Sequence, residues 1–143
     1  RGIYTEKEIK ASYEVNLEEV VIYHSLEAKT MVSMIHKDLI PMGMAELKDL
    51  SQILKFKNNE KLRTKYDKID KMITDLLECG EEIELLLDHS NKIDEIYKKA
   101  EYVERNIATI LLATRKIADQ MERLISRKNM TLPSYEDIFN SLS

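Results

Sequence analysis

The stretch NKIDEIYKKAEYVERNIATILLATRKIADQMERLISRK, residues Asn91–Lys128, decides the fold class of this chain. Its apolar residues recur in alternating steps of three and four, which is the spacing of one face of a helix. Ser90 or Asn91 is suited to cap the start, because a short polar side chain accepts hydrogen bonds from the first backbone N–H groups. The stretch therefore predicts a helix of roughly nine to ten turns with an uninterrupted heptad seam. Its seam consists of Ile93, Ile96, Ala100, Val103, Ile107, Ile110, Thr114, Ile117, Met121 and Leu124, and a second row consists of Tyr97, Leu111, Ala118 and Ile125.

The preceding segment, Glu60–Asp88, repeats this rhythm and predicts a second long helix. DHSN, from Asp88 to Asn91, is a short polar connection, so we expect the two helices to form an antiparallel hairpin. Gly80 occupies the one seam position of this segment that is not apolar. It indicates either a close approach of two helices or a C-cap or kink at this point.

The first third of the chain predicts another long helix with a different spacing. Over Ile9–Met42 the apolar residues step by four, four and three, an average of ~3.67 residues per turn that indicates a straight helix. Pro41 removes a backbone hydrogen bond and crowds the turn before it, so we expect a kink or break within Leu39–Gly43. The next turn is expected at Phe56–Glu60.

Together these patterns predict an all-α fold. We expect an antiparallel bundle of three long helices, the first kinked near Pro41, so that three to four helices can be counted. Residues 1–143 are expected to form a single bundle domain, with an extended C-terminal tail over residues 130–143. Because the chain starts at Arg1 without a Met, we also expect it to be a piece from the C-terminus of a longer enzyme.

Composition narrows the classes of protein to which the chain can belong. Its formal net charge is −4 with both signs mixed, which disfavours nucleic-acid binding, because that function needs a basic face. No apolar run approaches the ~18 residues that cross a membrane, so no membrane partner is expected. The single Cys79 excludes an internal disulfide, fits a reducing compartment and is expected to be a buried thiol.

The sequence holds no recognisable catalytic or metal-binding motif. HExxH, GxxxxGKS/T, GxGxxG and paired CxxC are absent. No Glu stands three residues before a His, so the pairs that build metal sites in helical bundles are missing as well. His24 is interpreted as a hydrogen-bonded packing residue, with a ligand or a pH switch as the alternative. We assign no catalytic, cofactor-binding or metal residue and expect a scaffold, docking or oligomerisation role.

Two apolar stretches are not explained by packing of the three helices. VVIY, from Val20 to Tyr23, is apolar on all sides, whereas a helix that hides one face needs only one apolar side. In TLPSYEDIF, from Thr131 to Phe139, the Pro ends the helix and leaves the aromatic residues free to lie on an apolar surface. The predicted interaction surface consists of Val20, Val21, Ile22, Tyr23, Leu26, Pro133, Tyr135 and Phe139.

Both ends of the chain resemble a known family. SLEAKTMVSMIHKDLIP, residues Ser25–Pro41, and the last helix with its tail, residues Ala100–Leu142, are similar to the C-terminal region of type III glutamine synthetases. The resemblance spans nearly the whole chain. The matching positions are Arg105, Leu112, Arg115, Asp119 and Glu122 in the helix, and Leu132, Pro133, Ser134, Tyr135, Asp137, Ile138 and Phe139 in the tail.

The resemblance implies a parent enzyme that joins glutamate and ammonia with ATP and a divalent metal, Mg or Mn. It implies a cytoplasmic homo-oligomer of two rings, in which the partner of this chain is an upstream catalytic domain of the same polypeptide. None of the family's catalytic motifs matches a position here, so the fragment itself is expected to bind no cofactor and to act in inter-domain packing or oligomer assembly. The alternative is a free-standing coiled-coil adaptor or protein-interaction module.

Overall fold

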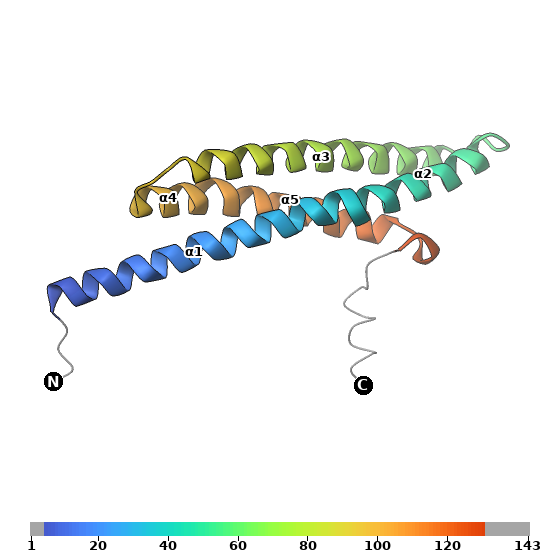
Figure 1. The fold of residues 1–143 in the computed structure, drawn as a ribbon. Coiled ribbons are helices and arrows are strands. Elements are labelled where there is room, and N and C mark those ends of the chain that lie inside the picture. The colour runs from blue at the N-terminus through green and yellow to red at the C-terminus, as the bar shows by residue number, and fades with distance from the viewer. Residues whose placement is uncertain (1–4, 131–143) are drawn as a thin grey trace, which may run out of the picture. The chain divides into compact units, whose positions relative to one another are not determined.

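The computed structural model describes residues 5–130, and every regular element in this part of the chain is a helix (Figure 1). Three helical stretches follow one another, with short connections after residue 54 and after residue 91. The prediction of an all-α bundle of three long helices is confirmed. The elements are α1 (Glu6–Met34), η1 (Ile35–Leu39), α2 (Ile40–Leu54), α3 (Glu60–Asn91), α4 (Ile96–Tyr102), η2 (Val103–Ile107), α5 (Ala108–Leu124) and η3 (Arg127–Asn129).

The chain divides into two compact units, and each takes segments from all three helical stretches. The first unit comprises the chain up to Val32 together with Cys79–Ala113, and the second comprises Ser33–Glu78 together with the chain from Thr114 onward. Each unit buries an apolar core of its own. The first core contains Val21, Ala28, Met31, Cys79, Ile83, Leu87, Ala100, Val103, Ile107 and Leu111, and the second contains Ile35, Leu39, Met42, Leu50, Ile69, Leu76, Met121 and Ile125.

The irregularity expected at Pro41 is a π-helical turn rather than a loop. In η1, immediately before this proline, the Ile40 N–H donates to the Ile35 carbonyl oxygen five residues back. Pro41 then lies at the start of α2, where a residue without an N–H is tolerated. The wider turn supplies the space that the proline ring needs, because a π-helical turn holds one more residue than an α-helical turn.

A second π-helical turn, η2, lies in the third helical stretch, which continues without a gap from Ile96 to Leu124, so the prediction of an uninterrupted heptad seam is wrong. Beyond η2 the predicted seam positions Thr114 and Met121 remain fully buried, but the other apolar seam positions do not. Leu111 and Ile125 lie in the core, whereas Ile110 and Leu124 of the predicted seam are only half-buried. Two successive steps of four, from 103 to 107 to 111, mark this change in the sequence.

The third stretch also starts later than predicted. α3 continues through Ser90 to Asn91, so neither residue caps the following helix. Glu95 is the N-cap of α4, and its carboxylate accepts hydrogen bonds from the backbone N–H groups of Tyr97 and Lys98 at 3.0 and 2.9 Å. A carboxylate also suits the positive end of the helix dipole, which explains why Glu can serve as a cap here.

The second predicted helix corresponds to α3 and begins at Glu60 as expected. It continues past Gly80, which is buried inside the helix and is therefore not a C-cap. The neighbouring Cys79 is a buried free thiol, which confirms its structural interpretation. Where α3 gives way to α4, the ring centroids of His89 and Tyr102 lie 4.6 Å apart.

Gly43 sets how closely α2 approaches its neighbours within the second unit. A Cβ atom at this position would lie 2.9 Å from the Cδ1 and Cγ1 atoms of Ile73 and 3.3 Å from the Cε atom of Met121. Distances this short force the neighbouring side chains to move. The packing of α2 against α3 and α5 at this level therefore depends on the missing side chain.

We expect Gly43→Ala to lower the free energy of unfolding. Overpacking costs about 1–3 kcal/mol, which exceeds the ~1 kcal/mol that Ala gains over Gly in a helix. The loss should shrink in an Ile73→Val background, because that change removes the Cδ1 atom. Urea denaturation of the single and double variants measures both effects, and a Gly43→Ala variant more stable than the native chain contradicts the close-packing interpretation.

Candidate interaction surface

The VVIY stretch of α1 divides between the core and the surface of the first unit. Val21 is 8% exposed and belongs to the core, and Val20 is half-buried. Ile22, Tyr23 and Leu26 are 57%, 64% and 59% exposed. The exposed part of the predicted surface in the described chain is therefore Ile22, Tyr23 and Leu26.

A row of apolar side chains follows the outer side of α1. Val15 is 52% exposed and lies seven residues before Ile22, and Leu26 lies four residues after it. Residues at these spacings share one face of a helix. We call Val15, Ile22 and Leu26 the outer row. Sequence reasoning missed Val15, although its spacing from Ile22 was the available signal.

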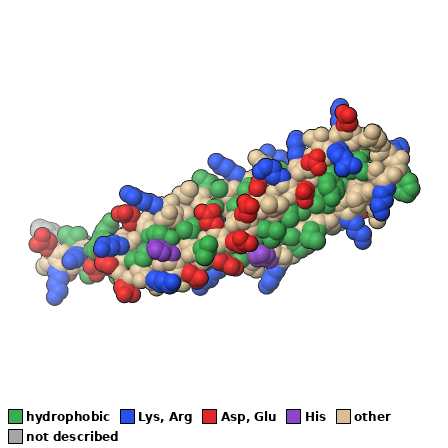
Figure 2. All heavy atoms as spheres, turned by 90° about the horizontal axis from the view of Figure 1, so that it is seen from above, with side chains coloured by type: hydrophobic (Ala, Val, Ile, Leu, Met, Phe, Trp, Pro, Cys, Tyr) green, Lys and Arg blue, Asp and Glu red, His purple; other side chains and the backbone are tan. Residues whose placement is uncertain are grey.

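The remaining members of the predicted surface, Pro133, Tyr135 and Phe139, lie outside the described residues. The same holds for the predicted tail beyond Met130, which is the last described residue. Within the described part, Figure 2 shows acidic and basic side chains interspersed over one face, with hydrophobic side chains exposed between them. Of the predicted interaction surface, the structure therefore describes only the residues of α1.

A groove of about 340 Å³ lies between α1 and α4 in the first unit. The rings of Tyr13 and Tyr97 meet there at a centroid distance of 5.9 Å and a tilt of 32°. The Tyr97 hydroxyl donates a long hydrogen bond of 3.4 Å to the Glu14 carboxylate. Burial and then the charge of Glu14 raise the pKa of Tyr97. The groove is lined by Tyr13, Leu17, Val20, Tyr97, Ala100, Glu101 and Glu104.

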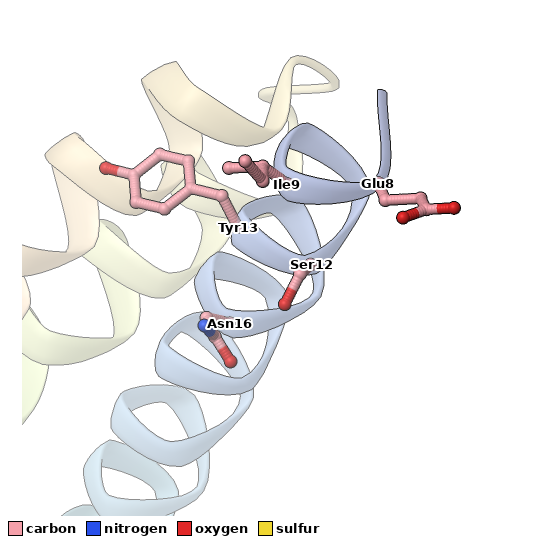
Figure 3. Close-up of a pocket in the computed structure, with 5 residues that line it drawn as sticks. All are labelled: Glu8, Ile9, Ser12, Tyr13 and Asn16. Carbon is pink, nitrogen blue, oxygen red and sulfur yellow. The ribbon is translucent and has the colours of Figure 1, made fainter. Parts of the chain in front are cut away.

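A larger hollow of about 680 Å³ lies nearer the start of α1 (Figure 3). The described residues that line it are Glu8, Ile9, Ser12, Tyr13 and Asn16, all from one helix. Figure 3 shows Tyr13 and Ile9 directed toward the neighbouring helix, whereas Glu8 points away from it. The described lining residues of this hollow all come from α1, whereas the groove is lined by residues of α1 on one side and of α4 and η2 on the other.

His24 has one partnered and one unpartnered nitrogen among the described residues. Its Nε2 atom lies 3.6 Å from a carboxylate oxygen of Glu104, and its ring packs edge-on against Tyr23 at 5.4 Å. Its Nδ1 atom is buried and has no hydrogen-bond partner in this part of the chain. His24 therefore lies at a packing interface as predicted, but only one of its two nitrogens has a polar contact.

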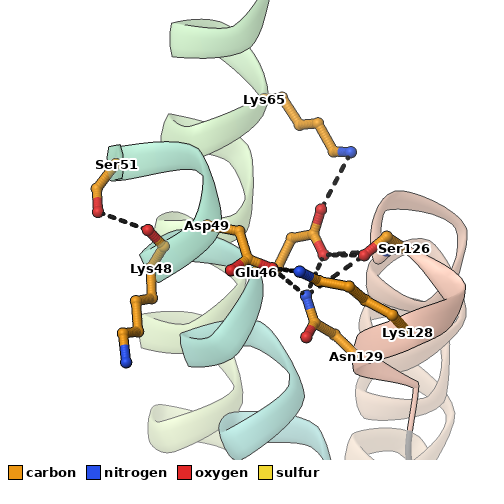
Figure 4. Close-up of polar contacts among 8 residues, drawn as sticks. All are labelled: Glu46, Lys48, Asp49, Ser51, Lys65, Ser126, Lys128 and Asn129. Carbon is orange, nitrogen blue, oxygen red and sulfur yellow. Dashed lines mark hydrogen bonds and ion pairs between the residues drawn. The ribbon is translucent and has the colours of Figure 1, made fainter. Parts of the chain in front are cut away.

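In the second unit, a buried carboxylate of α2 binds the residues that follow α5. Glu46 is 4% exposed, and one of its oxygens accepts hydrogen bonds from the Ser126 backbone N–H at 3.0 Å, the Ser126 hydroxyl at 2.7 Å and the Asn129 amide at 2.8 Å (Figure 4). Its other oxygen lies 3.4 Å from the Lys65 ammonium. Sequence reasoning missed Glu46, although its position four residues after Met42 on the apolar stripe was a signal.

The surroundings of Glu46 favour its charged form. Burial by itself raises the pKa of Glu46, but hydrogen bonds from Asn129 and Ser126 and the charge of Lys65 together hold it below the ordinary value of 4.5. Asp49 accepts from Asn129 at 2.9 Å as well, and this bond helps to lower the pKa of Asp49. The cluster therefore fastens η3 to α2 through ionised carboxylates.

The cluster should make the stability of the chain depend on pH below 4.5. A carboxylate with a lowered folded-state pKa stabilises the fold fully above its unfolded-state value and loses this contribution as pH falls through the folded-state pKa. Glu46→Gln should therefore cost roughly 1.5–3 kcal/mol of unfolding free energy at neutral pH, the range for a hydrogen bond to a charged group. The cost should vanish in acid.

Urea denaturation at pH values on either side of 4.5 measures this difference between the native chain and the variant. The exposed Glu78 of the same unit provides the matched control, and Glu78→Gln should change stability little at either pH. A cost of Glu46→Gln that stays constant across this range contradicts the role assigned to the charge.

Two further observations concern metal binding and membrane spanning. Within residues 5–130, no three His, Cys, Asp or Glu side chains gather as they would to hold a metal ion. No helix of the described residues combines the length and the apolar character needed to cross a membrane. The polar clusters that do exist join helices to one another.

Comparison with known proteins gives two matches. A family model described as the glutamine synthetase C-terminal domain matches residues 1–58. A curated glutamine synthetase from Butyrivibrio fibrisolvens is 29% identical over 148 residues, which cover 99% of this chain and 21% of the relative. The chain thus spans about a fifth of that relative's length. No solved structure matches the chain at a comparable level of significance. Both matches are to glutamine synthetase, and the family model assigns the similarity of residues 1–58 to the C-terminal domain of that enzyme.

Proposed function

We propose that this chain is the non-catalytic C-terminal helical domain of a type III glutamine synthetase. In this proposal the parent enzyme is a cytoplasmic homo-oligomer that joins ammonia to glutamate with ATP and a divalent metal. The catalytic, nucleotide and metal sites lie in another part of the polypeptide. The similarity of 99% of the chain to about a fifth of a glutamine synthetase supports the proposal.

The type III assignment rests on the resemblance of particular residues. In the last helical stretch Arg105, Arg115 and Asp119 occupy positions of the family's helical pattern. Arg105 and Arg115 are exposed on η2 and α5.

The observation that carries the proposed role in packing or assembly is the outer row of α1. Val15, Ile22 and Leu26 are each more than half exposed, and they share one helix face. Burying apolar area is favourable by about 25 cal/mol for each Å² removed from water. A row of large apolar side chains that the bundle leaves uncovered is therefore suited to pack against another protein surface.

Charges placed in the outer row should disrupt assembly of the full-length protein. We expect Ile22→Glu and Leu26→Glu to lower its sedimentation coefficient while circular dichroism shows unchanged helix content, because both side chains are exposed in the bundle itself. Leu85→Glu is the matched control, since Leu85 is 70% exposed on α3. Glutamine formation from glutamate, ammonia and ATP identifies the parent activity in the same samples.

Two outcomes would count against the proposal. If the outer-row variants sediment like the native protein, the row does not act in assembly. If the gene that encodes the chain contains no ligase domain, the alternative of a free-standing adaptor stands instead. In that case the outer row would bind a partner helix, and the isolated chain should self-associate or capture a helix through Ile22 and Leu26.

A further inference from the structure

We propose that the groove between α1 and α4 binds a basic, amphipathic segment of polypeptide, with a Lys or Arg side chain against the rings of Tyr13 and Tyr97. The proposal rests on the proposed function only for the source of this segment, which we take to be the rest of the same polypeptide. It assigns a partner chemistry to a surface distinct from the outer row.

The groove offers an apolar floor of limited size. Leu17, Val20 and Ala100 are the aliphatic residues that line it. A volume of about 340 Å³ is at the low end of the range for ligand sites. The groove can therefore accept individual side chains of a segment, and the segment's backbone would lie across its mouth.

The tyrosine pair provides faces on which a cation can pack. The rings are tilted by 32° and their centroids are 5.9 Å apart, so they are not stacked face to face. Lys and Arg side chains are attracted to the negative face of an aromatic ring. Glu14, whose carboxylate accepts a hydrogen bond from the Tyr97 hydroxyl, places an acidic side chain beside the same ring.

The charges around the groove are predominantly acidic. On α1, Glu14 accepts a hydrogen bond from the lining residue Tyr97, and the nearest Lys or Arg residues of this helix in the sequence are Lys10 and Lys29. On the opposite side the lining includes Glu101 and Glu104. A basic side chain entering the groove would therefore meet carboxylates from both helices.

The local partners of these carboxylates, Arg105 and His24, can be displaced. Glu101 is paired with Arg105 at 3.7 Å, and both side chains are largely exposed, so the pair contributes little to stability. Glu104 lies 3.6 Å from the His24 ring and is itself exposed. An incoming Lys or Arg can replace either contact without breaking a buried pair.

Charge also argues against the chain's own tail as the occupant. The sequence from Thr131 to Ser143 contains Glu136 and Asp137 and neither Lys nor Arg. The charge of this segment has the same sign as the charge of the groove, so the two would repel each other. The complementary partner is a segment in which apolar residues alternate with Lys or Arg.

Fluorescence anisotropy with two labelled peptides tests the proposal on the full 143-residue chain. One probe is an amphipathic peptide of Leu and Lys at helical spacing, and its twin carries Glu in place of each Lys. We expect the basic peptide to bind more tightly, and Tyr97→Leu and Glu101→Gln each to raise its Kd about two- to fivefold, the range for exposed cation–π contacts and ion pairs. The matched controls, Tyr23→Leu and Glu84→Gln, alter exposed residues that do not line the groove and should leave the Kd unchanged.

Equal affinity for the two peptides overturns the proposal, and so does an equal effect of groove and control variants. If circular dichroism shows that Tyr97→Leu unfolds the chain, Glu101→Gln decides the outcome, because Glu101 is exposed and its loss leaves the core intact. The proposed function is tested through Ile22 and Leu26, neither of which lines the groove. Each proposal can therefore fail while the other holds.

Discussion

The fold depends on keeping one apolar seam of each helical stretch turned toward a core over its whole length. A regular α-helix drifts away from any fixed repeat of three and four, so a long seam needs a local change in helix geometry. This chain makes the change with two π-helical turns, η1 before Pro41 and η2 before Ala108. In both, the extra residue lies between buried apolar side chains on either side of the turn, Met31 and Met42 around η1 and Ala100 and Leu111 around η2. In η1 it also provides room for a proline that would otherwise crowd the preceding turn.

A second constraint is the burial of a carboxylate in the second unit. Glu46 takes a position on the apolar stripe of α2, where an unpaired carboxylate would be costly to bury. Its oxygens are satisfied by Ser126 and Asn129 at the end of the third stretch and by Lys65 of α3. One buried charge thus joins all three helical stretches at the level where the described chain ends.

The sequence predicted the fold class because the spacing of apolar residues reports directly which helix faces are buried. It could not predict η2, since the spacing from Val103 to Leu111 is compatible with a regular helix until the positions beyond it are known. The cap at Glu95 was missed because Ser90 and Asn91 are the more typical capping residues. For the interaction surface, VVIY indicated an uncovered side, but an all-apolar stretch does not say which residue faces inward. The structure separates buried Val21 from exposed Ile22 and adds Val15 to the row.

In the function we propose, the outer row of α1 is covered by the rest of a glutamine synthetase polypeptide or by a second copy of it. The most direct measurement is the rate at which a thiol reagent modifies a Leu26→Cys side chain, followed by mass spectrometry at residue 26. The account predicts rapid modification in the isolated chain, where Leu26 is 59% exposed, and strong protection in the full-length protein. Equal rates in the two samples would contradict it.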